Sequence, residues 1–139
     1  MYTILICDDD KDIVSALDIY LTSEGYRTLK AYNGREAIQA VEQNEVHLIL
    51  MDVMMPEMNG LEATRAIRAF EHCPAESGIP IIAMTANVFA DDVKACLEAG
   101  MNSHVGKPLD MQVLAAEISR QVRRYASLRE GANFTKLGS

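Results

Sequence analysis

Short apolar runs alternate with stretches in which apolar residues recur at helical spacing, and this alternation constrains the fold more than any other feature. The runs are rich in β-branched residues and short enough to be strands. They lie at Thr3–Cys7, Arg27–Ala31, Val46–Met51, Ile81–Met84 and Ser103–Gly106. Strands that alternate with helices form a parallel sheet with helices on both faces and right-handed crossovers between the strands. The sequence therefore predicts an α/β fold with a doubly wound, five-stranded parallel sheet.

A helix is expected after each of these runs. The helices are expected over about Lys11–Glu24, from Asn33-Gly34, from Gly60 or Leu61, over about Val88–Ala99, and from Asp110. Asp10 precedes the first of them and is its expected N-cap, because a short acidic side chain accepts hydrogen bonds from free backbone amides there. Helical periodicity fades near Ser127. The sequence therefore predicts one domain over residues 1–127 and a flexible tail, or the start of a linker, over residues 128–139.

The bulk composition argues against several classes of function. The chain has 139 residues and a net charge of −7. Direct nucleic-acid binding usually requires a basic surface, and anionic membranes also attract basic segments. No apolar stretch approaches the length of a membrane span, and the N-terminal MYTILICDDD lacks the features of a signal peptide. Cys7, Cys73 and Cys96 are scattered and read as reduced thiols, so we expect a cytoplasmic protein that binds neither nucleic acid nor membranes.

Polar residues follow four of the expected strands. Asp52 ends a nearly continuous apolar run, and the segment VMMPEMNG after it contains proline and glycine, as a loop would. Asp8 and Asp9 follow the first strand, Thr85 follows the fourth, and Lys107 follows the fifth. In open α/β sheets, ligands bind beyond the carboxyl ends of the strands. If these strands are neighbours in the centre of the sheet, all five residues meet at one edge.

Such a group of residues predicts a metal-assisted phosphoryl site. Three carboxylates cannot remain ionised together without a counter-charge, and Mg²⁺ supplies one through oxygen ligands and retained waters; Mn²⁺ has similar preferences and is an alternative. Lys107 and the Thr85 hydroxyl would then bind an incoming phosphoryl group, and Asp52 would be the nucleophile. An acyl phosphate on aspartate is a known covalent intermediate.

Four segments in this order resemble the receiver domain of bacterial response regulators in two-component signalling. They are DDD after the first strand, MDVMMPEMNG, MTAN and GKP, and the resemblance extends from Thr3 to about Tyr125. It implies a flavodoxin-like (βα)5 fold with strand order 2-1-3-4-5. It also implies that a histidine kinase or a histidine phosphotransfer protein donates a phosphoryl group to Asp52. The chain would catalyse its own phosphorylation and slow autodephosphorylation, without being an enzyme proper.

The resemblance assigns roles to individual residues. Asp52 would be the phosphoacceptor, Asp9 would bind Mg²⁺ directly, and Asp8 would bind it mostly through water. Met54 would contribute its backbone carbonyl to the metal. Thr85 and Lys107 would bind the phosphoryl group, and the Lys107-Pro108 peptide would be cis.

Further roles concern switching and the lifetime of the phosphorylated state. Thr85 and His104 would shift on activation and change the face formed by the fourth helix, fifth strand and fifth helix. His104 stands where receivers commonly have an aromatic residue, and we expect a partly buried packing residue there. Met54 and Asn87 resemble positions that tune hydrolysis.

Two branches of the family contribute to the resemblance. The N-terminal half resembles receivers of transcription factors, whereas MTANVFADDVKACLEAGMNSHVGKPLD resembles receivers attached to hybrid sensor kinases. Members of the first branch often form dimers through charged pairs on the switching face. Asn102 and Ser103 replace acids that are frequent there, and Glu117 stands where a base is frequent. We therefore expect a monomer or a weak homodimer.

Two other interpretations remain open at this point. The chain could be a receiver-like module that docks proteins without phosphorylation. It could also be a Mg²⁺-dependent phosphatase with an aspartate nucleophile, although such enzymes usually carry a second aspartate at the position of Met54. The segment after Tyr125 is too short for another domain, so the chain is expected to be a stand-alone receiver or a fragment cut after the domain.

Overall fold

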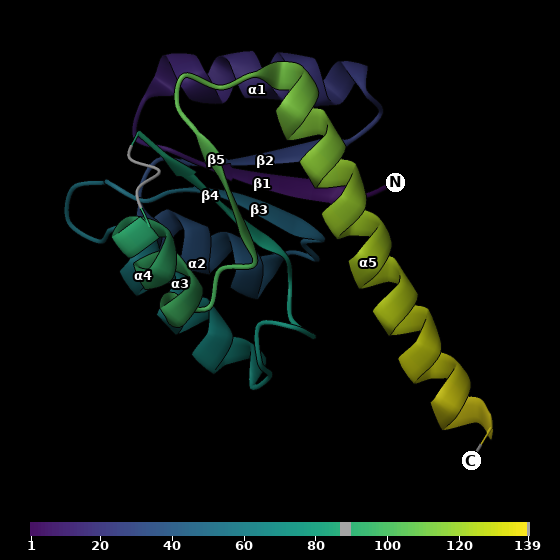
Figure 1. The fold of residues 1–139 in the computed structure, drawn as a ribbon. Coiled ribbons are helices and arrows are strands. Elements are labelled where there is room, and N and C mark those ends of the chain that lie inside the picture. The colour runs from purple at the N-terminus through teal and green to yellow at the C-terminus, as the bar shows by residue number, and fades with distance from the viewer. Residues whose placement is uncertain (87–89, 139) are drawn as a thin grey trace.

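The strands form one parallel sheet. The computed structural model describes the backbone of residues 1–86 and 90–138, and the side chains of that part except residues 90, 91 and 130–138. Within it, the five-stranded sheet has the order β2-β1-β3-β4-β5 (Figure 1). The strands are β1 (Thr3–Cys7), β2 (Arg27–Ala31), β3 (Leu48–Asp52), β4 (Ile81–Thr85) and β5 (Ser103–Gly106). The expected fold class and strand order are confirmed.

Burial explains why the central strands are apolar except for Thr3, Asp52 and Thr85 at their ends. Every residue of β1, β3 and β4 is buried, because helices cover both faces of the sheet. The edge strands β2 and β5 each contain exposed residues. The edge position of β2 accounts for its mixed sequence.

The helices divide into two layers (Figure 1). The layer on one face contains α1 (Lys11–Ser23) and α5 (Met111–Gly138), and the layer on the other contains α2 (Gly34–Gln43), α3 (Gly60–Glu71) and α4 (Ala90–Ala99). Each layer packs against its own set of strand side chains. Those under α1 and α5 include Ile4, Ile6, Leu48, Leu50 and Ile82. Those under the other helices include Leu5, Ile49, Met51, Ile81 and Ala83.

Side chains cap the helices near the points where the sequence places their starts. The Asp10 carboxylate accepts hydrogen bonds from the amides of Asp12 and Ile13, which confirms the expected N-cap of α1. Asn33 caps α2, and Asn59 forms a capping box with Glu62 at the start of α3. These caps fix where each helix leaves the carboxyl edge of the sheet.

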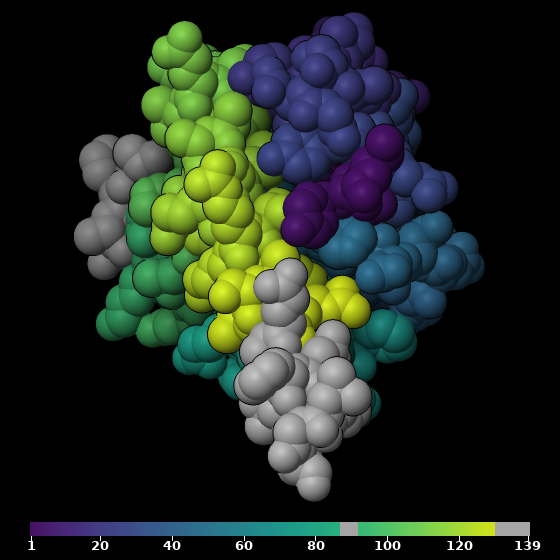
Figure 2. All heavy atoms as spheres, turned by 90° about the vertical axis from the view of Figure 1, so that its right-hand side faces the viewer, coloured from purple at the N-terminus to yellow at the C-terminus, as the bar shows by residue number. Residues whose placement is uncertain are grey.

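The last helix is longer than the sequence suggests. The backbone of α5 continues past Ser127 to Gly138, and its end projects beyond the sheet (Figure 1). Figure 2 shows α5 crossing one face of the molecule beside the N-terminal residues. Ala126, Leu128 and Arg129 favour helix, and no proline interrupts the segment, so nothing local ends the helix at Ser127.

Other boundaries agree within two residues where the structure describes them. The expected start of the fourth helix, Val88, lies outside the described residues, and α4 begins at Ala90. In the described part of the chain, no helix is both long and apolar enough to cross a membrane.

Candidate functional site

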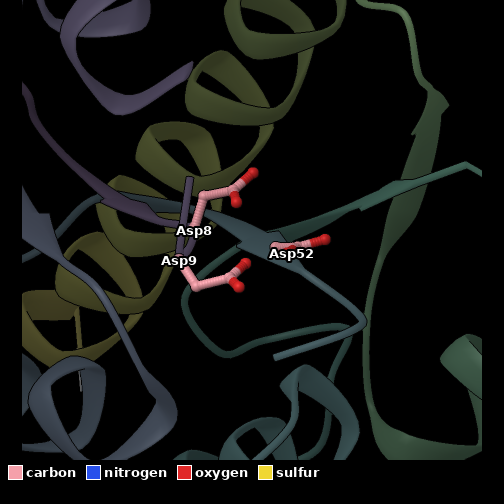
Figure 3. A group of neighbouring side chains, drawn as sticks. All are labelled: Asp8, Asp9 and Asp52. Carbon is pink, nitrogen blue, oxygen red and sulfur yellow. The ribbon is translucent and has the colours of Figure 1, made fainter. Parts of the chain in front are cut away.

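The carboxyl edge of the sheet brings the expected site residues to one place. Asp8 and Asp9 directly follow β1, Asp52 ends β3, and Thr85 ends β4. Lys107 directly follows β5. Because these strands are neighbours and parallel, their carboxyl ends meet at one edge, and the Asp8, Asp9 and Asp52 side chains project to the same side of it (Figure 3).

The three carboxylates form a compact acidic group. One oxygen from each of Asp8, Asp9 and Asp52 lies within 4.8 Å of the others. Asp8 is fully buried, Asp52 is 5% exposed, and Asp9 is exposed. Oxygens bound to one Mg²⁺ lie at most about 4 Å apart, twice the usual metal–oxygen distance. Side-chain shifts of about 1 Å would therefore let these carboxylates share one ion, so the residues fit the expected metal.

Asp8 and Asp9 differ in how freely they can bind a metal. The Asp8 carboxylate accepts hydrogen bonds at both oxygens, from the backbone amide of Asp10 at 2.9 Å and from Lys107 at 2.9 Å. Contact with a cation through water preserves both hydrogen bonds. The exposed Asp9 carboxylate is better placed for direct contact.

Lys107 supplies the positive charge of the site. Its Nζ donates to Oδ2 of Asp8 at 2.9 Å and to Oδ1 of Asp52 at 3.2 Å. Its backbone amide donates to the carbonyl of Thr85 at 2.8 Å, which ties the end of β4 to the residue after β5. The Lys107-Pro108 peptide is cis, as expected.

The surroundings shift the protonation of Asp52 and Lys107. Burial, together with the negative charge of Asp8, raises the pKa of Asp52 to about 7, although Lys107 opposes the shift. Burial disfavours the ammonium of Lys107, but its hydrogen bonds and charge interactions with Asp8 and Asp52 outweigh this effect and raise its pKa. The ammonium thus stays charged while Asp52 titrates near neutrality, which leaves an acidic site that an added cation would stabilise.

The remaining expected residues lie around this group or outside the described residues. Met54 is in the loop after β3 and is 78% exposed. His104 lies in β5 beside Ala83 of β4 and is exposed, so the expected partial burial is wrong. The edge position of β5 explains this, since helices cover an edge strand less completely than a central one. Asn87 lies outside the described residues.

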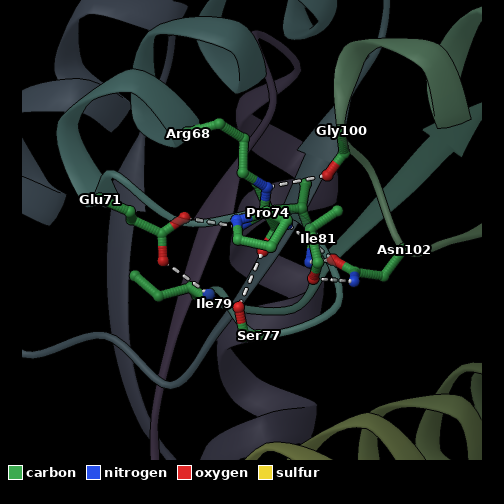
Figure 4. Close-up of polar contacts among 9 residues, drawn as sticks. Arg68, Glu71, Pro74, Ser77, Ile79, Ile81, Gly100 and Asn102 are labelled. Atoms are coloured by element: carbon green, nitrogen blue, oxygen red, sulfur yellow. Dashed lines mark hydrogen bonds and ion pairs between the residues drawn. The ribbon is translucent and has the colours of Figure 1, made fainter.

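The sequence did not reveal a second polar cluster at the opposite edge of the sheet (Figure 4). Arg68 donates to the carbonyl of Gly100 at 2.9 Å, to Oδ1 of Asn102 at 2.8 Å, and to the carboxylate of Glu71. Glu71 also accepts the amide of Ile79 at 2.7 Å. The side chains of Arg68 and Glu71 are only 11% and 10% exposed. The spacing of Arg68 and Glu71 on one helix was a signal for their ion pair, but their loop partners leave no pattern in the sequence.

Comparison with known proteins gives consistent results. The family model of the response regulator receiver domain matches residues 4–119. The DNA-binding response regulator MtrA of Mycolicibacterium smegmatis is 36% identical over 121 residues, which cover 87% of this chain and 50% of that protein. The probable histidine kinase 1 of Oryza sativa subsp. indica is also 36% identical, over 78% of this chain and 14% of that protein.

A solved structure is similar in both sequence and fold. It is the receiver domain of sensor histidine kinase PA1611 from Pseudomonas aeruginosa, which has a magnesium ion coordinated in its active-site cleft. Its TM-score is 0.76 and its identity 33%, over 87% of this chain and 97% of that one. The chain spans about half the length of the first curated relatives that it matches.

Proposed function

This chain belongs to the response regulator receiver domain family, the phosphoacceptor domains of two-component signalling, and we propose that Asp52 accepts the phosphoryl group. The observation that carries the proposal is the contact of Lys107 with both Asp52 and Asp8, at 3.2 and 2.9 Å, beside the third carboxylate of Asp9. This arrangement holds the nucleophile, Asp52, next to the ammonium of Lys107 and next to carboxylates that can bind a metal cation.

The donor is a phosphohistidine of a histidine kinase or of a histidine phosphotransfer protein. A carboxylate oxygen of Asp52 attacks phosphorus, and an acyl phosphate bond forms as the phosphorus–nitrogen bond breaks. The electron pair of the broken bond goes to the imidazole nitrogen, which takes up a proton. Lys107, already within 3.2 Å of Asp52, donates hydrogen bonds to the phosphoryl oxygens, and the Thr85 hydroxyl donates another.

A divalent cation completes the charge balance. Asp9 and the Met54 carbonyl would hold Mg²⁺ directly, with Asp52 as a further ligand and Asp8 bound through water. When bound, Mg²⁺ neutralises charge on the phosphoryl oxygens and keeps Asp52 ionised at neutral pH. Mn²⁺, which accepts the same oxygen ligands, would substitute for it.

An apolar groove beside the site provides a place for the donor protein. The groove has a volume of about 250 Å³ and lies between α1 and the residues after β5; it is lined by Ile13, Ala16, Lys107, Pro108, Leu109 and Met111. Because Lys107 belongs both to this groove and to the acidic group, a donor that packs there would bring its histidine close to Asp52.

Phosphorylation would then bias the face formed by α4, β5 and α5 between two states. The added negative charge draws the hydroxyl of Thr85, whose carbonyl already accepts the amide of Lys107. His104, exposed on β5, is free to follow. Met54 and Asn87 would set the lifetime of the acyl phosphate by controlling the approach of water.

The chain thus acts as a switch in the cytoplasm and turns over no external substrate beyond slow loss of its own phosphoryl group. Its net charge of −7 disfavours direct binding to nucleic acid. A strong dimer on the switching face is disfavoured, because Asn102 and Ser103 replace acids that would form its charged pairs. Glu117 in addition pairs within the chain with Arg120. The residues after Ser127 would act as a tail or as the start of a linker.

Electrophoresis in Phos-tag gels after incubation with acetyl phosphate tests the proposal. We expect a retarded band for the native chain with Mg²⁺, no retarded band with excess chelator, and none for Asp52→Ala. Lack of retardation in the native chain, or an equal retarded fraction in the variant, would overturn the assignment.

A further inference from the structure

The first residue of α3 approaches the backbone of the phosphoacceptor unusually closely. Gly60 is buried, and a Cβ placed on it would lie 2.2 Å from the carbonyl oxygen of Asp52. The same Cβ would lie 3.0 Å from the carbonyl carbon of Asp52 and 3.0 Å from Cγ of Met51. Even close carbon–oxygen contacts in proteins are about 3.3 Å. Any side chain at this position would therefore push the end of β3 and the start of α3 apart.

The close approach closes the loop that follows Asp52. The amide of Gly60 donates to the carbonyl of Val53 at 3.0 Å, and the amide of Val53 donates to the carbonyl of Met84 at 3.2 Å. The two ends of the loop of residues 53–59 therefore lie close together, and its first residue is hydrogen-bonded to β4. The loop carries Met54, and its geometry depends on how near Gly60 lies to the strand end.

A second glycine receives the far side of the same loop. Gly34, the first residue of α2, is covered by Met58, and a Cβ on Gly34 would lie 2.7 Å from Cγ and 2.8 Å from the carbonyl oxygen of Met58. The loop is therefore held between the start of α2 and the start of α3. A side chain at either glycine would displace the backbone that carries Met54.

We propose that Gly60 is a positioning residue that sets the backbone of Asp52 and of residues 53–59 for cation binding, with Gly34 supporting the same loop. The inference rests on the proposed function of Asp52 and deepens it. Gly60 does not touch the reacting atoms; it acts through the carboxylate of Asp52 and the carbonyl of Met54.

Gly78 offers a matched control at the opposite edge of the sheet. It is also buried, and a Cβ on it would lie 2.5 Å from Nη1 of Arg68 and 2.8 and 2.9 Å from the two carboxylate oxygens of Glu71. Gly78→Ala therefore also crowds a buried position, far from the acidic group, but against the ends of side chains and not against backbone. Gly78→Ala shows whether a buried glycine-to-alanine change away from the acidic group alters cation binding.

The test is a Mg²⁺ titration followed by amide nuclear magnetic resonance for the native chain, Gly60→Ala and Gly78→Ala, with thermal unfolding of each. We expect Gly60→Ala to raise the Mg²⁺ concentration at half-saturation about tenfold to one-hundredfold, as for other residues that orient metal ligands. Gly78→Ala should keep the native half-saturation, even though it lowers the unfolding temperature. A merely structural role of Gly60 would reduce the folded fraction but leave the half-saturation of the folded fraction unchanged, and that result would overturn the proposal.

Gly34→Ala keeps the proposal testable if Gly60→Ala has no native-like spectrum. It should weaken Mg²⁺ binding about threefold to tenfold, because it displaces the loop from its other side; native half-saturation in this variant would overturn the proposal. If the native chain binds Mg²⁺ but is not phosphorylated by acetyl phosphate, the proposed function fails while the effect of Gly60 on Mg²⁺ binding still stands or falls by the titration. A native chain without saturable Mg²⁺ binding overturns the metal site and this inference together.

Discussion

The two polar clusters at opposite edges of the sheet differ in how their charges are balanced. At the carboxyl edge, the three carboxylates of Asp8, Asp9 and Asp52 face one ammonium among the residues that the structure describes, that of Lys107. At the other edge, the carboxylate of Glu71 pairs with the guanidinium of Arg68. Among the described residues, the charges of the second cluster are balanced, whereas the first cluster carries more negative than positive charge.

This difference distinguishes a site that can bind a ligand from a cluster that only stabilises the fold. Glu71 accepts hydrogen bonds from Arg68 and from the amide of Ile79, and Asn102 both donates and accepts hydrogen bonds. Such a satisfied network holds α3 and the loops before β4 and β5 in one arrangement. The carboxyl edge instead keeps the pKa of Asp52 raised to about 7, mainly through burial. Binding of a cation or of a proton offsets the cost of this buried negative charge, so the carboxyl edge is the one that responds to a ligand.

The largest expected effect on stability comes from removing the guanidinium from the cluster of Arg68, Glu71 and Asn102. Arg68→Ala removes the only guanidinium at Glu71 among the described residues and should lower the free energy of unfolding by about 3–5 kcal/mol, because it leaves a buried carboxylate without its partner. Urea denaturation measures the change. Mg²⁺ half-saturation of the folded variant should remain native. A loss below about 1 kcal/mol would show that this cluster does not stabilise the fold, because exposed ion pairs contribute that little.

The unbalanced edge should respond in the opposite direction. Asp52→Asn replaces a buried carboxylate with an amide of similar size and should raise the free energy of unfolding of the metal-free chain by about 1–3 kcal/mol at neutral pH. On folding, the pKa of Asp52 rises from its usual 3.8 to about 7, so the folded chain holds a proton there that the unfolded chain has lost. Stability of the native chain should therefore fall as pH rises through this interval.

Urea denaturation at several pH values in the presence of a chelator tests this expectation. The free energy of unfolding of Asp52→Asn should depend less on pH than that of the native chain. When Mg²⁺ replaces the chelator, the pH dependence of the native chain should also become flatter. Parallel curves for the two proteins would contradict the raised pKa of Asp52.

Much of this contrast, but not all of it, follows from the sequence. Asp8, Asp52 and Lys107 each follow an apolar run, and parallel strands must place such residues at one edge. The order of the strands came from the family resemblance, because apolar periodicity does not encode which strands are neighbours. The contacts of Arg68 and Asn102 could not be predicted, because their partners include the backbone of Gly100 and Ile81, which no sequence pattern reveals.

The length of α5 shows a similar limit. Helical periodicity indicates the face of a helix that packs on the core, and the end of α5 projects beyond the sheet (Figure 1). Beyond Ser127, only intrinsic propensity remains as a signal, and a pattern of buried residues cannot locate the end of such a helix.

Lys107 allows a smaller and sharper test of the unbalanced edge. Lys107→Met removes the ammonium that competes with an added cation for Asp8 and Asp52, so Mg²⁺ should bind about threefold to tenfold more tightly. Phosphorylation by acetyl phosphate should nevertheless slow, because the phosphoryl oxygens lose a hydrogen-bond donor. Calorimetric titration and the rate of the Phos-tag shift measure the two effects. Weaker Mg²⁺ binding in the variant would mean that Lys107 helps to build the cation site.

The smallest effect should come from an ion pair outside both clusters. Arg129 of α5 pairs with Glu45 at 3.3 Å, and the two side chains are 51% and 67% exposed. Arg129→Ala should change the free energy of unfolding by less than about 1 kcal/mol, because water screens such pairs. Urea denaturation of this variant sets the baseline for Arg68→Ala. A larger loss would mean that the contact between α5 and Glu45 stabilises the domain.

The most direct measurement is the chemical location of the phosphoryl group. After reaction with acetyl phosphate and Mg²⁺, borohydride reduction converts an aspartyl phosphate to homoserine, and peptide mass spectrometry then identifies the residue. We expect homoserine at Asp52 and at no other acid, with none formed in the presence of chelator. Homoserine at Asp8 or Asp9 instead, or none at all in the native chain, would contradict the assignment of Asp52 as the phosphoacceptor.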